Sequence, residues 1–263
     1  MLTDNIRFQS DALVKFFDGH RDKWDEFYPS EQWAFQTIAD ERAGRLRRVL
    51  DVGCATGGLG LALSSRFAVD HYTGVDINRQ VIEQAQKSTA RFSIPATFYC
   101  DDILTLDQIP SASFEIVASL GCADWNIATQ RIIDRCWQFV APGGCFVMSV
   151  RLTDRDGIND FARSHQPIAH DSAGNVIESA NYVVFNWREY LRLCARLSPP
   201  PATLSGYGYW GKPASNAVTP YDRLVFGVII VRKAPAGVEP RQISVALNLP
   251  LDLLTAENER DES

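Results

Sequence analysis

Three aspartates follow short apolar runs of the chain, and each of them could contact a ligand. Asp51 stands in "RRVLDVGCATGG", Asp76 ends "YTGVD", and Asp101 follows "ATFYC". If these runs are neighbouring parallel strands, their carboxyl ends meet at one edge of a sheet, where open α/β sheets bind their ligands. Each aspartate alone could equally cap the turn or helix after it. Together they predict a polar crevice along that edge.

The segment after Asp51, "GCATGG", predicts a tight turn that leads into a helix. Apolar residues recur at helical spacing from Leu59 to Phe67. The pattern G-x-A-x-x-G, with Asp76 lying 23 residues after Gly53, is close to the dinucleotide-binding fingerprint. On these features alone, an NAD-dependent enzyme and a protein that binds a different nucleoside are both open.

The charge of Asp51 distinguishes between these two kinds of ligand. A pyrophosphate prefers bare N–H groups at a helix start, and a neighbouring carboxylate would repel it. S-adenosylmethionine has a cationic sulfur, an ammonium group and no phosphate, so a carboxylate at the mouth of the turn suits it. The alternative role of Asp51 is to cap the local backbone. We therefore expect a cationic nucleoside cofactor.

Short apolar strands alternate with amphipathic helices around these residues. Strands are expected over 49–52, 71–77, 96–100, 114–120 and 145–152, and two further strands over 202–210 and 223–233. The clearest helix has Ile132, Ile133, Cys136, Trp137 and Val140 on one buried stripe. This alternation predicts right-handed crossovers and a parallel sheet that is covered on both faces.

Three segments flank or interrupt the alternating core, which we place at 46–233. Residues 1–45 contain two expected helices, "SDALVKFF" and "SEQWAFQTIADERAG", which predict an N-terminal helical segment. Residues 153–181 are polar and too long for a simple connection, so they predict a lid insertion. Residues 234–263 form a C-terminal tail whose apolar patch, "ISVALNLPLDLL", packs on its own domain or on another subunit.

Composition argues against several classes of protein. The chain has 263 residues, of which 46% are hydrophobic and 22% charged, as in an ordinary globular protein. The net charge of −6 argues against a nucleic-acid partner, because phosphate neutralisation requires a surplus of Lys and Arg. No apolar stretch reaches the ~18 residues of a membrane span, and "MLTDNIRFQSD" lacks the regions of a signal peptide. We expect a cytoplasmic protein with no membrane partner.

The six cysteines and four histidines show no spacing typical of metal ligands. No two cysteines form a CxxC pair. Most of them lie in apolar segments, where reduced cysteines act as small hydrophobic residues. We therefore expect no metal site.

Five stretches, taken in order, resemble the motifs of the class I S-adenosylmethionine-dependent methyltransferases. They are "VLDVGCATGG", "YTGVDIN", "FYCDDIL", "FEIVASLGCADW" and "CWQFVAPGGCFVMSV". Ala55 takes the place of the middle glycine in the first motif, and it therefore needs a permissive backbone angle. The resemblance covers about Leu46 to Leu152. It implies an α/β fold: a doubly wound, mostly parallel, seven-stranded sheet with helices on both faces, which the two C-terminal strands complete.

The resemblance also implies that S-adenosylmethionine is the bound cofactor and that S-adenosylhomocysteine is the product left after transfer. Asp76 would bind both ribose hydroxyls, and Asp101, with Asp102 alongside, would reach the adenine amino group. The fourth motif would run beneath the methionine portion, and the N-terminal segment would close over the cofactor. The expected cofactor-binding residues are Asp51, Gly53, Cys54, Ala55, Gly57, Asp76, Ile77, Asp101, Asp102, Ser119, Leu120, Tyr28 and Trp33.

The family has no universal catalytic residue, so a general base must be sought outside the shared core. Asp124, His165 and His170 are the candidates. Asp124 could instead cap the helix that begins in "IATQRIID", and the two histidines could simply be solvated.

The methyl acceptor is expected to be a small molecule, because the chain is acidic and rich in aromatic residues near its two ends. Oxygen is preferred over nitrogen as the methylated atom, on a sugar or a natural product. The alternatives are a nicotinamide-dependent oxidoreductase and a non-catalytic protein that binds the cofactor. The acceptor and the formation of a homodimer stay open.

Overall fold

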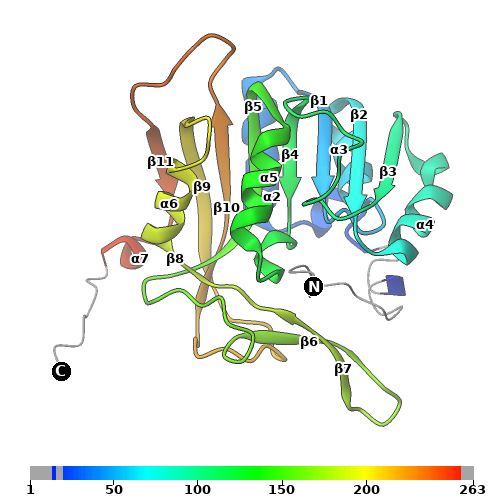
Figure 1. Cartoon of the computed structure of the whole chain (residues 1–263), viewed down its shortest axis with the longest axis vertical. Helices are drawn as coiled ribbons and strands as arrows, with labels where there is room; N and C mark the ends of the chain where they lie inside the picture. The colour runs from blue at the N-terminus through cyan, green and yellow to red at the C-terminus, as the bar shows by residue number, and fades with distance from the viewer. Residues whose placement is uncertain (1–13, 16–19, 256–263) are drawn as a thin grey trace.

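Alternating apolar segments of the chain form one mixed β-sheet of nine strands in the computed structural model, which describes residues 14–15 and 20–255. Most of the expected helix "SDALVKFF" lies outside the described residues. The strand order is β11-β9-β10-β5-β4-β1-β2-β3, with β8 paired to β5 (Figure 1). The strands of this sheet are β1 Arg45–Val52, β2 Ala68–Asp76, β3 Ala96–Cys100, β4 Phe114–Ser119, β5 Val140–Thr153, β8 Phe185–Asn186, β9 Pro201–Gly211, β10 Leu224–Lys233 and β11 Ser244–Asn248.

The first five strands pair in parallel, and helices connect them except between β3 and β4, which a loop joins. Strand β10 then pairs antiparallel with both β5 and β9. The helices are α2 Pro29–Glu41, α3 Gly58–Arg66, α4 Arg79–Lys87, α5 Thr129–Phe139, α6 Trp187–Ala195 and α7 Leu251–Thr255, with single 3-10 turns η1 Trp24–Glu26, η2 Thr89–Arg91 and η3 Ala123–Trp125. The doubly wound, mostly parallel α/β fold is therefore confirmed. Strands β8 and β11 extend the seven strands expected.

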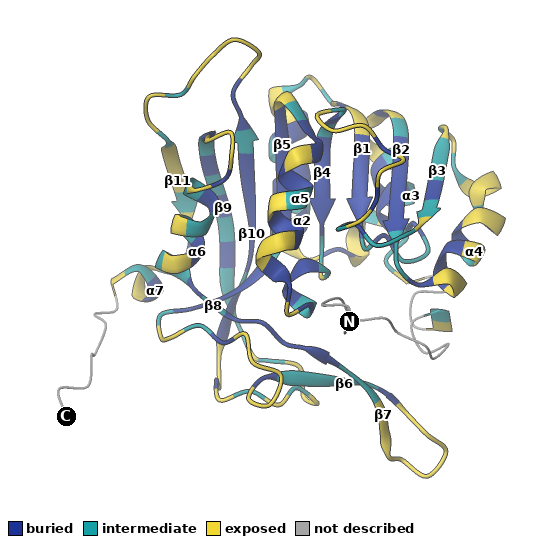
Figure 2. Cartoon of the chain, viewed as in Figure 1, coloured by how far each residue is buried: buried dark blue, intermediate teal, exposed yellow. Residues whose placement is uncertain are grey.

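Both faces of the central strands β4, β5 and β10 are buried, which explains why these strands are largely apolar. Successive residues of β1 face opposite ways: Val49 joins the cluster that contains Phe35 of α2, whereas Leu50 joins the cluster that contains Trp137 of α5 and Tyr190 of α6. The strands are mostly dark in Figure 2, and the outer faces of the helices are exposed. Because β1, β2 and β4 run in parallel, the loops that follow them lie at the same end of the sheet.

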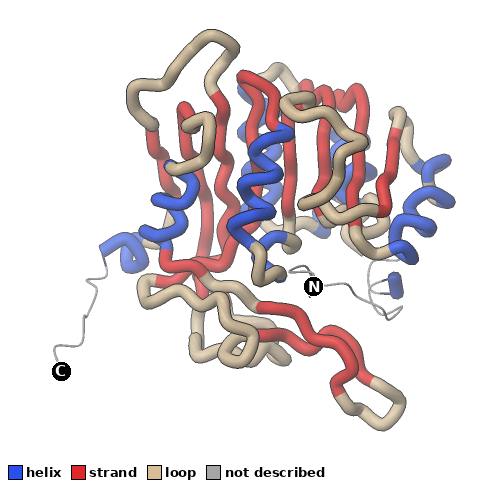
Figure 3. Tube along the Cα trace, viewed as in Figure 1, coloured by secondary structure: helices blue, strands red, loops and turns tan. Residues whose placement is uncertain are grey.

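The insertion after β5 forms a β-hairpin where the sequence predicted a lid loop. Strand β6, His165–His170, pairs antiparallel with β7, Val176–Asn181, and the hairpin projects beyond the main sheet (Figure 3). The turn between them is stabilised by the Asp171 carboxylate, which accepts hydrogen bonds from the N–H groups of Ala173 and Asn175. Polar side chains along both strands hide the period-two pattern that would predict them.

The C-terminal apolar patch packs on its own domain. Strand β11 pairs in parallel with β9, and Leu253 of α7 is fully buried in the cluster that also contains α5 and α6. The Trp210 indole of β9 donates a hydrogen bond of 2.8 Å to Asp252. Within the described part of the chain, no helix is long and apolar enough to cross a membrane.

We predict that Leu253→Ala lowers the free energy of unfolding by about 2–5 kcal/mol, because a buried leucine loses its contacts and leaves a cavity. Leu251 is the matched control on the same helix, since its exposed fraction is 75% against 0% for Leu253. Leu251→Ala should change the stability by less than about 0.5 kcal/mol. Urea denaturation measures both, and equal effects would contradict the packing of α7.

Candidate functional site

The strands bring the predicted aspartates to the same end of the sheet, at the carboxyl ends of β1, β2 and β3. Asp51 of β1 is in register with Gly74 of β2, and Asp76 is in register with Cys100, the last residue of β3. Asp101 follows directly. These carboxyl ends are neighbours because β1, β2 and β3 run in parallel, and open α/β sheets bind their ligands at this end of the strands.

The glycine turn after β1 is held by backbone hydrogen bonds to β2. The N–H groups of Gly53 and Cys54 donate to the Val75 carbonyl at 2.8 and 3.1 Å. Gly53, Ala55 and Gly57 have φ angles of +77°, +47° and +86°. Ala55 thus adopts the left-handed conformation that its place in the motif requires. This conformation favours glycine, because a Cβ crowds the following carbonyl.

Asp76 connects the glycine turn to the start of α4. One carboxylate oxygen accepts the Ala55 N–H at 3.0 Å, and the other accepts the Asn78 N–H at 2.8 Å. Burial raises the pKa of Asp76, while these backbone donors act to lower it. Each carboxylate oxygen can accept a second hydrogen bond. The half-buried side chain can therefore also bind a ligand hydroxyl.

Asp51 lies beneath the turn, where it is buried, and not at its open mouth. The Tyr72 hydroxyl donates a hydrogen bond of 2.5 Å to it. Burial raises the pKa of Asp51 to about 7, partly offset by the Tyr72 hydrogen bond; the charge of Asp76 raises this pKa further, and the charge of Arg21 lowers it. The carboxyl group therefore changes protonation state near neutral pH.

Arg21 lies beside the start of α3, and the sequence analysis did not identify it. Its guanidinium forms an ion pair of 2.6 Å with buried Glu31 and lies 4.6 Å from the centre of the Phe27 ring. A Cβ built on Gly58, the first residue of α3, would overlap the Arg21 carbonyl oxygen. The segment around Arg21 therefore covers the start of α3. No motif in the sequence marks this arginine.

Asp124 and Arg151 form a buried ion pair on the other side of the glycine turn. Asp124 Oδ2 lies 3.1 Å from Arg151 Nη1, and the exposed fractions of the two side chains are 4% and 7%. The guanidinium also packs over the Tyr182 ring, 3.8 Å from its centre. Burial raises the pKa of Asp124, and Arg151 lowers it. Asp124 does not cap α5, whose N-cap is Ala128.

Cys122 places this ion pair next to the glycine turn. A Cβ built on Gly53 would lie 2.5 Å from both Cβ and Sγ of Cys122, so only glycine fits there without a shift. The Ser119 hydroxyl accepts the Ala123 N–H at 3.3 Å and holds the start of η3. The fourth motif is thus packed directly against the first.

The other predicted cofactor residues take part in local packing and turns. Asp101 accepts the Asp102 N–H, and Asp102 accepts the Leu104 N–H, as in consecutive turns. Trp33 packs on the Tyr207 ring with centroids 5.7 Å apart, and Tyr28 is 58% exposed. Cys54 is buried, whereas Ile77 and Leu120 are half-buried.

The two candidate histidines lie in the hairpin insertion. One ring nitrogen of His165 is 2.9 Å from the Phe161 carbonyl oxygen, and its ring stacks on Phe161. His170 is exposed beside the hairpin turn. Within the described residues, neither histidine forms a hydrogen bond with Asp51, Asp76 or Asp124.

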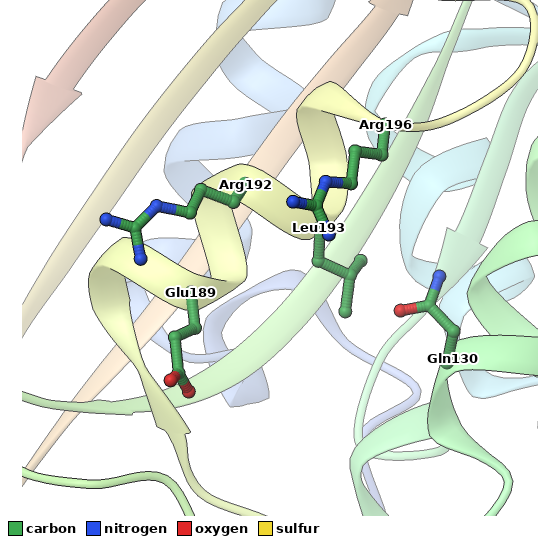
Figure 4. Close-up of a pocket in the computed structure, with 5 residues that line it drawn as sticks. All are labelled: Gln130, Glu189, Arg192, Leu193 and Arg196. Atoms are coloured by element: carbon green, nitrogen blue, oxygen red, sulfur yellow. The ribbon is translucent and has the colours of Figure 1, made fainter.

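A hollow of about 440 Å³ lies away from these residues. Figure 4 shows that Gln130 comes from α5 and that the other lining side chains come from α6 and its end. The hollow is lined by Gln130, Glu189, Arg192, Leu193 and Arg196. No predicted site residue lines it.

Comparison with known proteins identifies the domain that these strands and helices form. Residues 49–144 match a family model described as a methyltransferase domain. The chain carries a class I S-adenosylmethionine-dependent methyltransferase domain. The resemblance seen in the five motifs is thus confirmed, and S-adenosylmethionine is the cofactor that belongs to this domain. The glycine cradle closed by Cys122, with Asp76 beside it, fits that nucleoside.

Two curated relatives are methyltransferases. The chain is 31% identical over 150 residues to the ubiquinone biosynthesis O-methyltransferase of Coxiella burnetii, covering 55% of this chain and 63% of the relative. It is 28% identical over 154 residues to the demethylmenaquinone methyltransferase of Leptospira interrogans, covering 54% of this chain and 58% of the relative. The chain therefore spans less than two thirds of the length of these relatives.

A solved structure supports the fold beyond the matched segment. The S-adenosylmethionine-dependent methyltransferase of Mesorhizobium loti has a TM-score of 0.52 and 16% identity, covering 80% of this chain and 100% of that one. At this identity the likeness concerns the fold alone.

We predict that Gly53→Ala lowers the free energy of unfolding by about 2–4 kcal/mol, the sum of left-handed backbone strain and overpacking against Cys122. Gly174→Ala is the matched control: its φ is +86°, but nothing lies within 4 Å of a Cβ built there. It should cost only about 1–2 kcal/mol, the strain alone. Urea denaturation compares the two, and equal losses would argue against the close contact with Cys122.

We predict that Asp51 makes the unliganded protein less stable as pH rises from 4 to 7. The folded state holds the Asp51 proton up to a pKa of about 7, against 3.8 for the ordinary group, so it binds more protons than the unfolded state across this window. Asp51→Asn removes this effect. At about 1.4 kcal/mol for each pH unit, the variant should gain on the order of 4 kcal/mol relative to the wild type between pH 4 and 7.

Urea denaturation at several pH values measures this gain. Asp134→Asn, on the exposed face of α5, is the control, and its difference from the wild type should not vary with pH in this way. A constant difference for Asp51→Asn would contradict the raised pKa.

Proposed function

We propose that this protein transfers a methyl group from S-adenosylmethionine to an oxygen atom of a small molecule. The observation that carries the proposal is the glycine turn after β1, joined to the Asp76 carboxylate at the end of β2 by the Ala55 N–H. The family of the domain and the order of its five motifs support the same reaction. The two relatives named as methyltransferases of ubiquinone biosynthesis and of demethylmenaquinone favour a ring compound related to quinones as the acceptor.

Each part of the crevice has a proposed role toward the cofactor. Asp76 accepts hydrogen bonds from the two ribose hydroxyls with the capacity that its backbone donors leave. Asp101 binds the adenine amino group. Arg21 offers a positive charge to the carboxylate of the methionine portion, and the acidic groups Asp51 and Glu31 suit its ammonium and sulfonium.

Methyl transfer needs alignment and the exclusion of water more than it needs chemical activation. S-adenosylmethionine, when bound, supplies a methyl group that is already activated on a sulfonium. We propose that residues 1–45 and 153–181 act as lids over this crevice. The contact of the Arg21 backbone with Gly58 supports this role for the first of them.

Asp76→Ala should weaken the binding of S-adenosylhomocysteine by about 10- to 100-fold. The reason is that a hydrogen bond to a charged group contributes about 1.5–3 kcal/mol. Isothermal titration calorimetry measures the dissociation constant. Asp134→Ala, on the outer face of α5, is the matched control and should bind as the wild type does. Unchanged affinity in Asp76→Ala would contradict the role of Asp76.

The same calorimeter separates the proposal from its main alternative. The wild type should bind S-adenosylhomocysteine and give no saturable heat with NADH. Binding of NADH without any response to S-adenosylhomocysteine would overturn the proposed function.

A further inference from the structure

We propose that Asp124 is the catalytic base, that Arg151 is its positioning residue, and that the acceptor is a neutral aromatic molecule with a ring hydroxyl. This inference rests on the proposed methyl transfer and adds to it the proton acceptor and the class of acceptor. It depends on one atom, Oδ1 of Asp124.

Asp124 Oδ1 is buried and has no hydrogen-bond partner among the described residues. An unpartnered buried polar atom costs about 1–3 kcal/mol, and native proteins rarely retain one without a use. An ion pair that served only as an anchor would gain by satisfying both carboxylate oxygens. The free oxygen indicates that a donor from outside the chain completes this site.

Arg151 holds Asp124 so that the other oxygen stays available. Its Nη1 lies 3.1 Å from Asp124 Oδ2 and donates to the carbonyl oxygens of Asp124 and Val183 at 3.1 and 3.2 Å. The guanidinium also packs against two rings, 3.8 Å from the centre of Tyr182 and 5.1 Å from that of Trp125. These contacts hold Oδ2 of the Asp124 carboxylate in place and do not involve Oδ1.

Asp124 lies close in the chain to a residue that contacts the glycine turn. Cys122, two residues earlier, packs on Gly53 of that turn. A hydroxyl that reaches Oδ1 is therefore close to the region where the methyl donor binds.

The charges and rings around Asp124 define the acceptor. The acids Asp51, Asp76, Asp124 and Glu31 outnumber the arginines Arg21 and Arg151, so the site disfavours an acceptor that carries a carboxylate or a phosphate. The buried Tyr182 ring meets the half-buried Trp125 ring edge to face at 6.4 Å, and the Trp125 ring can pack against a planar molecule. A neutral ring with an O–H group satisfies both features, because the hydroxyl donates to the buried carboxylate.

The proposed step balances as follows in atoms and charge. As the O–C bond to the acceptor forms, the C–S bond breaks with its electron pair on sulfur, and the hydroxyl proton passes to Asp124 Oδ1. Asp124 then releases this proton to solvent. Burial raises the pKa of Asp124, which makes its carboxylate a stronger base than an exposed aspartate.

The test uses the full chain, saturated with S-adenosylhomocysteine for binding and supplied with S-adenosylmethionine for turnover. The probes are catechol, 1,2-dimethoxybenzene, 1,2-phenylenediamine and 3,4-dihydroxybenzoate. Catechol should bind at least 10-fold more tightly than each of the other three. The variants are Asp124→Asn and Arg151→Lys, which conserve shape or charge, with Asp134→Asn as the control.

Asp124→Asn should bind S-adenosylhomocysteine within 2-fold of the wild type, bind catechol about 10-fold more weakly, and lower kcat for catechol about 100-fold or more. The acid limb of the pH–kcat profile should disappear. Arg151→Lys should keep this limb but shift it, because the charge beside Asp124 remains while its geometry changes. Asp134→Asn should match the wild type in every measurement.

Several results would overturn the inference while leaving the proposed function intact. For Asp124→Asn, these results are an unchanged catechol affinity and pH profile, or a loss of S-adenosylhomocysteine binding. For the wild type, they are tighter binding of the diamine, the dimethyl ether or the benzoate than of catechol, or failure to bind any of the four probes. Failure of the wild type itself to bind S-adenosylhomocysteine would instead remove the proposed function.

Discussion

The hydrogen bond from the Ala55 N–H to Asp76 joins the loop after β1 to the end of β2. Without it, the glycine turn after β1 and the start of α4 would be separate loops at the end of a sheet. Asp76 uses one oxygen for each of them, so a ligand that binds Asp76 contacts a carboxylate whose direction is already fixed. The positive φ angles of Gly53, Ala55 and Gly57 serve the same constraint, because only this path of the turn brings the Ala55 N–H to β2.

Much of this arrangement follows from local patterns in the sequence. The parallel strands are apolar because both faces are covered, and the aspartates are recognisable because each one ends such a run. The left-handed angle at Ala55 could be anticipated from its place in the motif. Such features depend on neighbours in the chain or on adjacent parallel strands, which is why sequence reasoning finds them.

Other features depend on contacts between distant segments that no local pattern encodes. Arg21 pairs with Glu31 from a connection with no motif, and Arg151 pairs with Asp124 across 27 positions of the chain. Both strands of the β6–β7 hairpin carry many polar side chains, so the alternation of apolar and polar residues that predicts a strand cannot be recognised. The burial of Asp51 beneath the turn also required the structure, since its partner Tyr72 belongs to the next strand.

Strand β11 forms one edge of the main sheet, beside β9. The two outermost strands of this sheet, β3 and β11, have only five residues each, whereas β9, which β11 covers, has eleven. Long open edges are templates for intermolecular pairing, and short ones are poor templates. The tail therefore protects the protein from aggregation through β9, and a chain shortened before Ser244 would lose that protection even if its crevice stayed complete.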